Sequence, residues 1–456
     1  MDVTDGVPTP QRYWAILTIA LGLILAVLDG AIANVALPTI ARDVNASPAS
    51  SIWVVNAYQL AVTISLLPFA SLGDIVGYRR VYRWGLVVFT VASLGCAMAD
   101  SLLTLTLARI VQGFGAAGIM SVNGALIRFI YPRESIGRGV GINATVGSIS
   151  SAIGPTVASA ILAVAPWPWL FAVNVPIGIL AILIAWRALP ATPSAGHKFD
   201  VPSAGMTALT IGLAISAMDG LGHGESVWIV AIEFALTAAL AVVLVVRQLA
   251  QPSPLLPVDL MRIPLFALSV ATSVCAFAAQ GMSYVSLPFL FQNTLGKSQV
   301  VTGLLMTPWP LTVAVIAPFA GRLSDRYPAG LLGGVGLAIM AGGLAAVALL
   351  PPDPSALDVA WRMTLCGFGF GFFNTPNNRA IIMTAPRHRS GGASGMQATS
   401  RLLGQTLGAA TVALVFGLTQ PAHGTVLTLM IAACIAGAAA LVSFTRLLDR
   451  GRAAGE

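Results

Sequence analysis

The chain has 456 residues, of which 57% are hydrophobic and only 9% are charged. Because soluble domains carry roughly 25% charged residues, this composition excludes a soluble globule and is typical of a protein embedded in lipid. The net charge of +7 does not indicate a nucleic-acid partner, since the basic residues alternate between loops as membrane topology requires. The cysteines lie within apolar runs and lack metal-ligand spacing, so we predict no metal site, disulfide or bound cofactor. They are Cys96, Cys275, Cys366 and Cys434.

Apolar segments recur along the whole chain, each long enough to cross a hydrocarbon core of roughly 30 Å as a helix. We therefore predict an all-α integral membrane protein with fourteen transmembrane helices. The predicted spans are 13–38, 52–72, 84–99, 102–131, 139–164, 169–187, 203–219, 226–247, 264–292, 300–320, 331–350, 357–384, 391–418 and 424–446. The sequence has no His cluster, nucleotide-binding loop or nucleophile motif, so we do not expect an enzyme.

The basic residues of the loops are divided unequally between the two sides of the membrane. One side holds Arg12, Arg79, Arg80, Arg83, Arg128, Arg133, Arg138, Arg187, Lys198, Arg247, Arg262, Arg322, Arg326, Arg379, Arg387, Arg389, Arg446, Arg450 and Arg452. The other side holds only Arg42, Lys297 and Arg362. Since positively charged loops stay in the cytoplasm, we predict that both termini are cytoplasmic. The preference for arginine over lysine, with much Ala and Gly, fits a GC-rich bacterial genome and hence a bacterial inner membrane.

The two halves of the sequence repeat each other. Gly113-Phe114-Gly115 recurs as Gly367-Phe368-Gly369, and Asn123 recurs as Asn377, both at an offset of 254 residues. Spans one to six are therefore predicted to be duplicated as spans nine to fourteen, whereas 203–247 has no counterpart and is interpreted as an inserted helix pair. The predicted domains are a six-helix bundle at 13–187, a linker with two helices at 188–262, a second bundle at 263–446 and a cytoplasmic tail at 447–456.

The loop after the second span resembles the signature loop of the major facilitator superfamily. It reads Ala70-Ser71-Leu72-Gly73-Asp74-Ile75-Val76-Gly77-Tyr78-Arg79-Arg80, and its partner in the second half reads Gly321-Arg322-Leu323-Ser324-Asp325-Arg326-Tyr327-Pro328. The resemblance implies a latch in which acidic and basic loop residues pair with neighbouring helix ends. Its members here would be Asp74, Gly77, Arg79, Arg80, Asp325 and Arg326. The alternative is that the arginines only set the topology.

Three further motifs extend the resemblance over essentially the whole chain. Arg109–Gly115 is similar to a motif whose intramembrane arginine takes part in proton coupling, and Gly147 with Gly154-Pro155 is similar to the motif of exporters in this superfamily. Leu28–Gly30 followed by Asn34–Pro38 is similar to a pattern of the fourteen-span drug:proton antiporters. The chain thus resembles multidrug exporters of quaternary ammonium compounds and methyl viologen, which implies a major facilitator fold and a cationic, lipophilic substrate.

Three ionisable residues inside predicted spans are candidates for proton coupling: Asp29, Arg109 and Glu233. Asp29 lies deep in the first span, where burial disfavours the charged form of a carboxylate, so that proton and cationic substrate can compete for it. Arg109 shares a helix face with Gln112 and needs a partner or a wet cavity. Purely structural roles stay open for all three, and Glu233 in particular can be a protonated acid in the inserted pair.

The predicted substrate cavity combines polar and aromatic side chains of both halves, since cations bind over aromatic faces and loosely selective pockets have few polar anchors. Its members are Asn34, Trp53, Tyr58, Gln112, Asn143, Gln280, Tyr284, Trp309, Asn374, Asn377, Gln397, Arg401 and Gln405. Arg401 does not fit a cation site unless its charge is neutralised.

The prediction is therefore a proton-coupled multidrug exporter that works as a monomer among membrane lipids, without nucleic acid. The alternative is a transporter for a neutral or anionic metabolite or a lipid, anchored by Arg109 and Arg401.

Overall fold

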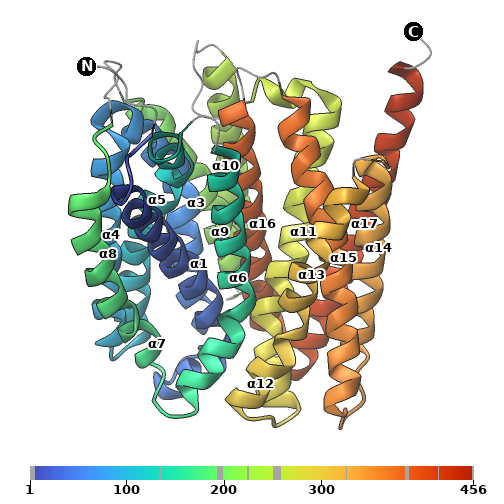
Figure 1. The fold of residues 1–456 in the computed structure, drawn as a ribbon. Helices are drawn as coiled ribbons and strands as arrows, with labels where there is room; N and C mark the ends of the chain where they lie inside the picture. Colours follow the sequence, from blue (N-terminus) through green and yellow to red (C-terminus); the bar gives the residue numbers. More distant parts are fainter. Residues whose placement is uncertain are drawn as a thin grey trace. The chain divides into compact units, whose positions relative to one another are not determined.

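The computed structural model describes residues 6–132, 136–192, 199–222, 225–249, 258–324, 326–385, 390–419 and 421–453. Helices dominate these residues, and no strand occurs among them (Figure 1). The predicted all-α class is therefore confirmed.

Every predicted span coincides with a helix or with consecutive helices. The first half forms α1 (Gln11–Asp43), α2 (Pro48–Ser51), α3 (Trp53–Val76), α4 (Tyr78–Ala97), α5 (Leu102–Ile130), α6 (Ile136–Leu162), α7 (Trp169–Ala172) and α8 (Asn174–Ala188). The inserted pair is α9 (Val201–Gly222) and α10 (Val227–Leu249). The second half forms η2 (Leu260–Arg262), α11 (Pro264–Phe289), η3 (Leu290–Thr294), α12 (Gln299–Met306), α13 (Pro308–Leu323), α14 (Ala329–Ala348), α15 (Ala356–Thr384), α16 (Ser390–Leu418) and α17 (Pro421–Ala453).

Length and apolarity identify most of these helices as membrane spans. Within the described ranges, eleven helical segments are long and apolar enough to cross a bilayer. The other three predicted spans lie on α4, α6 and α15, which are continuous helices of 20, 27 and 29 residues. The last helix, α17, continues to Ala453 and so extends beyond the predicted end of its span at residue 446.

The contacts divide the chain into two compact units. The first unit comprises Met1–Ala46 and Trp53–Ala208, and the second comprises Ser47–Ile52 and Leu209–Glu456. Helix α9 therefore begins in the first unit and ends in the second. The domain boundaries expected at residues 187 and 262 stay a prediction.

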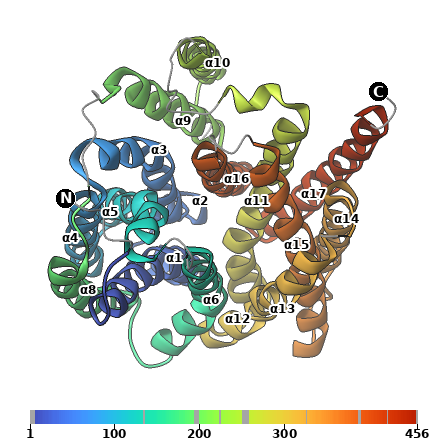
Figure 2. The same ribbon diagram turned by 45° about the horizontal axis from the view of Figure 1, so that its top comes forward.

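The same packing occurs inside each unit. In the first unit α5 packs against α4 and α3, and in the second unit α15 packs against α14 and α13 (Figure 2). Glycines allow the close approach: a Cβ atom at Gly85 would lie 2.9 Å from the carbonyl oxygen of Gly115, and one at Gly336 would lie 2.7 Å from that of Gly369. Small residues let membrane helices touch through their backbones, so the repeated glycines indicate a repeated helix interface.

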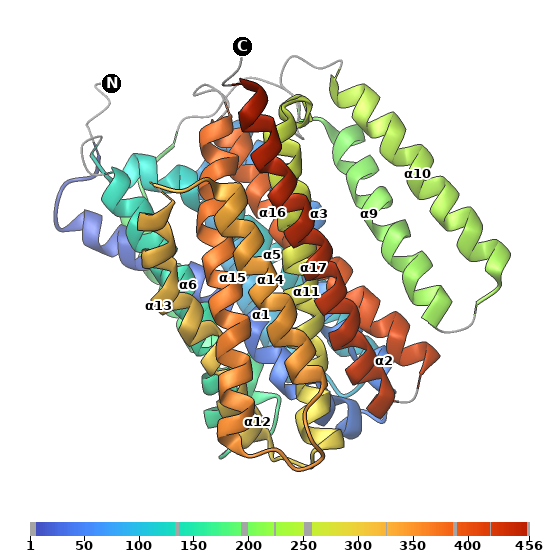
Figure 3. The same cartoon turned by 90° about the vertical axis from the view of Figure 1, so that its right-hand side faces the viewer.

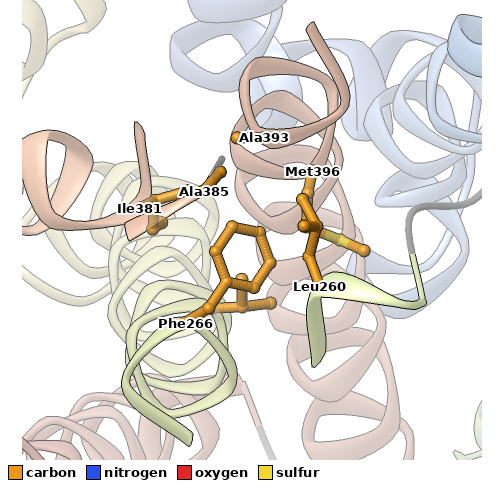
Figure 4. Close-up of a cluster of buried hydrophobic side chains, with 7 residues drawn as sticks. Leu260, Phe266, Ile381, Ala385, Ala393 and Met396 are labelled. Carbon is orange, nitrogen blue, oxygen red and sulfur yellow. The ribbon is translucent and has the colours of Figure 1, made fainter. Parts of the chain in front are cut away.

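A buried apolar cluster at one end of α11 holds the second unit together locally. Figure 4 shows Leu260 of η2 and Phe266 of α11 against Ile381 and Ala385 at the end of α15 and Met396 of α16. Phe266 is fully buried in this cluster. The segment that leads into α11 is therefore fixed by side-chain packing against two other helices of its own unit.

The inserted pair makes few tertiary contacts. Figure 3 shows α9 and α10 side by side, and of the described α10 side chains only Val230, Leu244 and Gln248 are buried. The hydroxyl of Ser216 on α9 donates to Oε1 of Glu233 on α10 at 2.9 Å. Most α10 side chains are apolar and exposed, as expected for a helix that faces lipid.

The glycine interface predicts different outcomes for two alanine substitutions on α5. Gly115→Ala should lower stability by about 1–3 kcal/mol, because its Cβ would meet the α4 backbone. Gly124→Ala is the matched control: nothing lies within 4 Å of its Cβ, so it should be neutral or stabilise by up to about 1 kcal/mol. Thermal unfolding of the purified protein in detergent measures both. Equal effects would contradict the close α4–α5 contact.

Candidate functional site

A buried ion pair lies at the centre of the first unit. Arg109 of α5 is 0% exposed and Asp29 of α1 is 1% exposed, and Nη1 of Arg109 donates to Oδ2 of Asp29. A charge without water needs a partner and hydrogen bonds, and here each ion supplies the other's counter-charge. The structure thus brings together two of the three predicted proton-coupling residues.

Amide groups satisfy the other oxygen of the carboxylate. Nε2 of Gln112 donates to Oδ1 of Asp29 at 3.0 Å, and Nδ2 of Asn174 donates to the same atom at 2.6 Å. Gln112 also accepts from Nη1 of Arg109 at 2.6 Å and donates to the hydroxyl of Ser93 at 2.9 Å. Residues of α1, α4, α5 and α8 therefore form one hydrogen-bonded cluster, in which both carboxylate oxygens of Asp29 have donors.

The guanidinium of Arg109 has further contacts on its far side. Nε donates to the carbonyl oxygen of Val54 at 3.0 Å, and the guanidinium carbon lies 4.1 Å from the ring centroid of Tyr58 and 5.4 Å from that of Phe171. Both distances allow cation–π attraction. The hydroxyl of Tyr58 donates to the carbonyl oxygen of Ala26 at 2.8 Å, which fixes the ring against α1. The remaining nitrogen, Nη2 of Arg109, is buried without a hydrogen-bond partner.

The comparison with known proteins agrees with this architecture. Residues 19–409 match the family model of the Major Facilitator Superfamily. The chain belongs to this superfamily. It is a membrane transporter of the superfamily, and the predicted superfamily membership is confirmed.

Three curated relatives show how far the similarity extends. The "Uncharacterized transporter YebQ" of Escherichia coli is 58% identical, over 98% of this chain and 99% of the relative. The "Riboflavin transporter RibZ" of Clostridioides difficile is 31% identical, over 88% of this chain and 87% of the relative. The "Multidrug resistance protein Stp" of Mycobacterium tuberculosis is 32% identical, over 86% of this chain and 73% of the relative. Relatives with different named roles therefore share this fold.

Glu233 takes no part in the ion-pair cluster. It lies on α10 in the second unit, where Oε1 accepts from Ser216 and Oε2 is buried without a hydrogen-bond partner. Glu233 is thus bound within the inserted helix pair, and both of its interpretations, a coupling residue and a structural acid, stay predictions.

The predicted cavity residues of the first unit separate into two groups. Tyr58 and Gln112 are buried: the Tyr58 ring packs against the guanidinium of Arg109, and Gln112 donates to Asp29. They do not form an open wall in this structure. Asn34 and Asn143 have buried side-chain oxygens without hydrogen-bond partners, and their place in a cavity stays a prediction. Trp53 begins α3 and is partly exposed.

In the second unit, aromatic and amide side chains meet between α11, α13 and α16. The rings of Tyr284 and Trp309 lie edge to face with centroids 5.3 Å apart, and Nε2 of Gln405 donates to Oε1 of Gln280 at 3.5 Å. Trp309 is 0% exposed, and its Nε1 lacks a hydrogen-bond partner. These contacts bring four predicted cavity residues into two side-chain pairs, and their place in a substrate cavity stays a prediction.

The other predicted cavity residues of the second unit differ in their surroundings. Asn374 has a buried oxygen without a hydrogen-bond partner, whereas Asn377 donates to the Ser269 carbonyl oxygen at 3.1 Å. Gln397 and Arg401 are half-buried on α16. Asn377 is thus held by hydrogen bonds within its unit, whereas the side-chain oxygen of Asn374 has no partner; the cavity roles of both stay predictions.

The glycines of the exporter motif bring α6 onto α1. A Cβ atom at Gly154 would lie 2.5 Å from Cβ of Ala31, and one at Gly147 would lie 3.6 Å from Leu23. Pro155 continues α6, and its carbonyl oxygen accepts from the hydroxyl of Ser159 at 2.8 Å. The motif therefore sets the distance between α6 and the helix that carries Asp29.

The loop between α3 and α4 has a different arrangement from the expected ionic latch. Asp74 accepts a hydrogen bond from the hydroxyl of Tyr78, and the structure gives it no ion pair in the described part of the chain. Burial and then this hydrogen bond raise the pKa of Tyr78 to about 12, so the phenol stays a donor near neutral pH. Gly77 has a φ of +95°, a conformation that side chains disfavour, and it approaches Thr192 closely.

The basic latch residues also bind otherwise than expected. Nη1 of Arg80 donates to the carbonyl oxygen of Val76 at 3.3 Å, and the backbone N–H of Arg79 donates to Thr192 at 3.3 Å. Arg326 is exposed, and Asp325 lies outside the described residues. The arginine that ties α4 to α8 is instead Arg83, whose Nη2 donates to the Ala185 carbonyl oxygen at 3.0 Å.

Three buried polar residues that make these hydrogen bonds are not identified by the sequence patterns. Asn174 and Ser93 stand in apolar segments, where an amide or hydroxyl is a signal of interhelical bonding. The sequence pattern places Arg446 among the basic residues that flank spans. In the structure it is 2% exposed, and its Nη1 donates to Oδ1 of Asn377 at 2.9 Å. Nothing in the sequence distinguishes Arg446 from the exposed arginines that also follow spans. Among the described residues, no group of three His, Cys, Asp or Glu side chains is placed to hold a metal ion.

The ion pair predicts a strong coupling between Asp29 and Arg109. Asp29→Asn should destabilise the protein by about 3–5 kcal/mol, because Arg109 would keep a buried charge without its counter-ion. Adding Arg109→Gln should restore part of this loss, so that the two effects are not additive. Thermal unfolding of the single and double variants in detergent measures the coupling. Asp43→Asn, at the exposed end of α1, is the control, and additive effects would contradict the pair.

The Asp74–Tyr78 hydrogen bond predicts a kinetic phenotype. Asp74→Asn and Tyr78→Phe should each slow transport more than they weaken substrate binding, since the bond fixes a loop between helices. Because Tyr78 is protonated well above neutral pH, the effect of Tyr78→Phe should not vary with pH across the neutral range. Initial transport rates and equilibrium binding, measured on the same preparation, test this. A variant whose binding falls as much as its transport would count against the role.

Proposed function

We propose that this transporter exports lipophilic cations in exchange for protons by alternating access. The observation that carries the proposal is the buried Asp29–Arg109 pair, a neutral cluster whose charge changes when one proton binds. Protonation of Asp29 removes the counter-charge of Arg109, and a buried unpaired guanidinium costs several kcal/mol. The protonated and ionised forms therefore favour different arrangements of α1 and α5.

The two carboxylate oxygens have unequal roles in this proposal. Oδ1 accepts from two amides, whereas Oδ2 accepts from Arg109. A proton that binds at Oδ2 displaces Nη1 of Arg109 and leaves both amide bonds intact. Arg109 then retains the Val54 carbonyl oxygen, the Gln112 oxygen and the Tyr58 ring as weaker partners.

This geometry favours indirect coupling over direct competition at one carboxylate. A substrate cation at Asp29 would have to displace either Arg109 from Oδ2 or two amides from Oδ1. In the indirect form the proton loosens α1 from α5, and the substrate binds elsewhere, among residues such as Tyr284 and Trp309. Aromatic faces attract cations, which supports the proposed substrate class.

The relatives support two substrate classes. Similarity to the multidrug resistance protein Stp supports drug export, and similarity to the riboflavin transporter RibZ supports a metabolite instead. The ion pair counts against an anionic substrate at Arg109, because Asp29 neutralises the guanidinium. The alternating basic loops support a bacterial inner-membrane protein with both termini in the cytoplasm, and we propose that it acts as a monomer.

Transport in liposomes tests the proposal. With an imposed pH gradient, the purified protein should move a quaternary ammonium cation or methyl viologen, and the cation should drive a counterflow of protons that a pH-sensitive dye detects. Asp29→Asn/Arg109→Gln, which removes both buried charges, should still bind the cation but lose the proton flux, whereas Asp43→Asn should retain it. Movement of riboflavin without any cation would favour the metabolite class. Proton counterflow in the double variant would move the coupling site away from Asp29.

A further inference from the structure

A basic pocket lies where α3, α4 and the end of α8 meet in the first unit. Its lining includes Arg79, Arg80 and Arg83 together with Thr192, and its volume is about 310 Å³. Arg83 is held by α8 carbonyl oxygens, while the structure gives the guanidinium of Arg79 no hydrogen bond or ion pair within the described ranges. Arg83 lies just before the predicted span 84–99. Burial, and then the nearby charge of Arg79, lower the pKa of its guanidinium. Among the described residues that line the pocket, none is an acid that could balance these charges.

An apolar groove continues from this pocket along the outer face of the same unit. The groove has a volume of about 440 Å³ and shares Val76 and Arg80 with the basic pocket. Its walls come from α3, α4 and α5 and include Trp84 and Phe114, which are 69% and 36% exposed. Large exposed apolar side chains of a membrane helix face lipid, and tryptophan marks the interface region.

The combination defines the chemistry of an occupant. Three guanidinium groups that line one pocket attract an anion, and guanidinium binds phosphate well. The adjoining apolar groove requires a hydrocarbon chain attached to that anion, which a free phosphate lacks. Basic pockets between transmembrane helices on the cytoplasmic side are suited to anionic lipid headgroups, and the positive-inside pattern places these arginines on that side.

We infer that this pocket and groove form a binding site for one anionic phospholipid, with its phosphate at Arg79, Arg80 and Arg83 and an acyl chain between Val76 and Val88. The site does not depend on the proposed transport function. Since its lining runs from Val76 and Gly77, where α3 meets α4, to Thr192 after α8, the bound lipid holds these helices together and stabilises this conformation of the first unit.

Native mass spectrometry of the delipidated protein tests the site. Phosphatidylglycerol should be retained in preference to phosphatidylcholine with the same acyl chains. Arg80→Gln should weaken its binding about fivefold, and Arg79→Gln/Arg80→Gln roughly 25-fold, from about 1 kcal/mol per basic residue at an anionic lipid surface. Arg262→Gln, which removes an exposed arginine of the second unit, should leave it unchanged.

A second variant separates the groove from the charges. Val88→Phe fills the groove and keeps every arginine, so it should weaken phosphatidylglycerol but not inorganic phosphate. Equal retention of phosphatidylcholine and phosphatidylglycerol would overturn the inference. So would displacement of the lipid by an equal concentration of phosphate, or wild-type lipid binding in both the double arginine variant and Val88→Phe.

Discussion

The burial of one guanidinium organises the first unit. Arg109 has no exposed surface, so every part of its charge must be compensated by protein groups. Asp29 of α1 supplies the counter-charge, Asn174 of α8 and Gln112 of α5 bind the carboxylate, and Ser93 of α4 binds Gln112. Four helices are thus fixed relative to one another by one charge, in surroundings where lipid gives little other preference for one helix pairing over another.

The second unit repeats the packing without repeating the charge. It has Gln280 at an offset of 251 residues from Asp29 and Met363 at an offset of 254 from Arg109, although Gly336 and Gly369 reproduce the helix contact of Gly85 and Gly115. Its own buried cation, Arg446, binds the neutral Asn377 instead of an acid. The interface glycines therefore maintain the architecture of both units, while the buried Asp29–Arg109 ion pair belongs to the first unit.

The sequence predicts the helices and the repeat well, because span length and glycine spacing are local signals. It also shows that a buried Arg109 requires a partner, but it does not identify the contacts. Asn174 follows Asp29 by 145 residues along the chain, and only the packing of α8 against α1 brings the amide to the carboxylate. Likewise, the loop motif identifies Asp74 and the arginines but not their partners. The Tyr78 hydroxyl donates to Asp74, and Arg83 donates to a carbonyl oxygen of α8.

The energies of the contacts around Arg109 also constrain how a proton at Asp29 can act in the proposed coupling. Once its counter-ion is neutral, Arg109 keeps the ring of Tyr58, which is worth about 0.5–2 kcal/mol, and hydrogen bonds to Val54 and Gln112. Leaving a buried charge without its partner costs about 3–5 kcal/mol, which the ring alone does not offset. In the proposed coupling, water must therefore reach the guanidinium when Asp29 is protonated, and Nη2, buried without a hydrogen-bond partner in this structure, is the atom best placed to bind it. Hydration of Arg109 would require α5 to separate from α1 or α3, so the proposal makes proton binding and helix movement a single event.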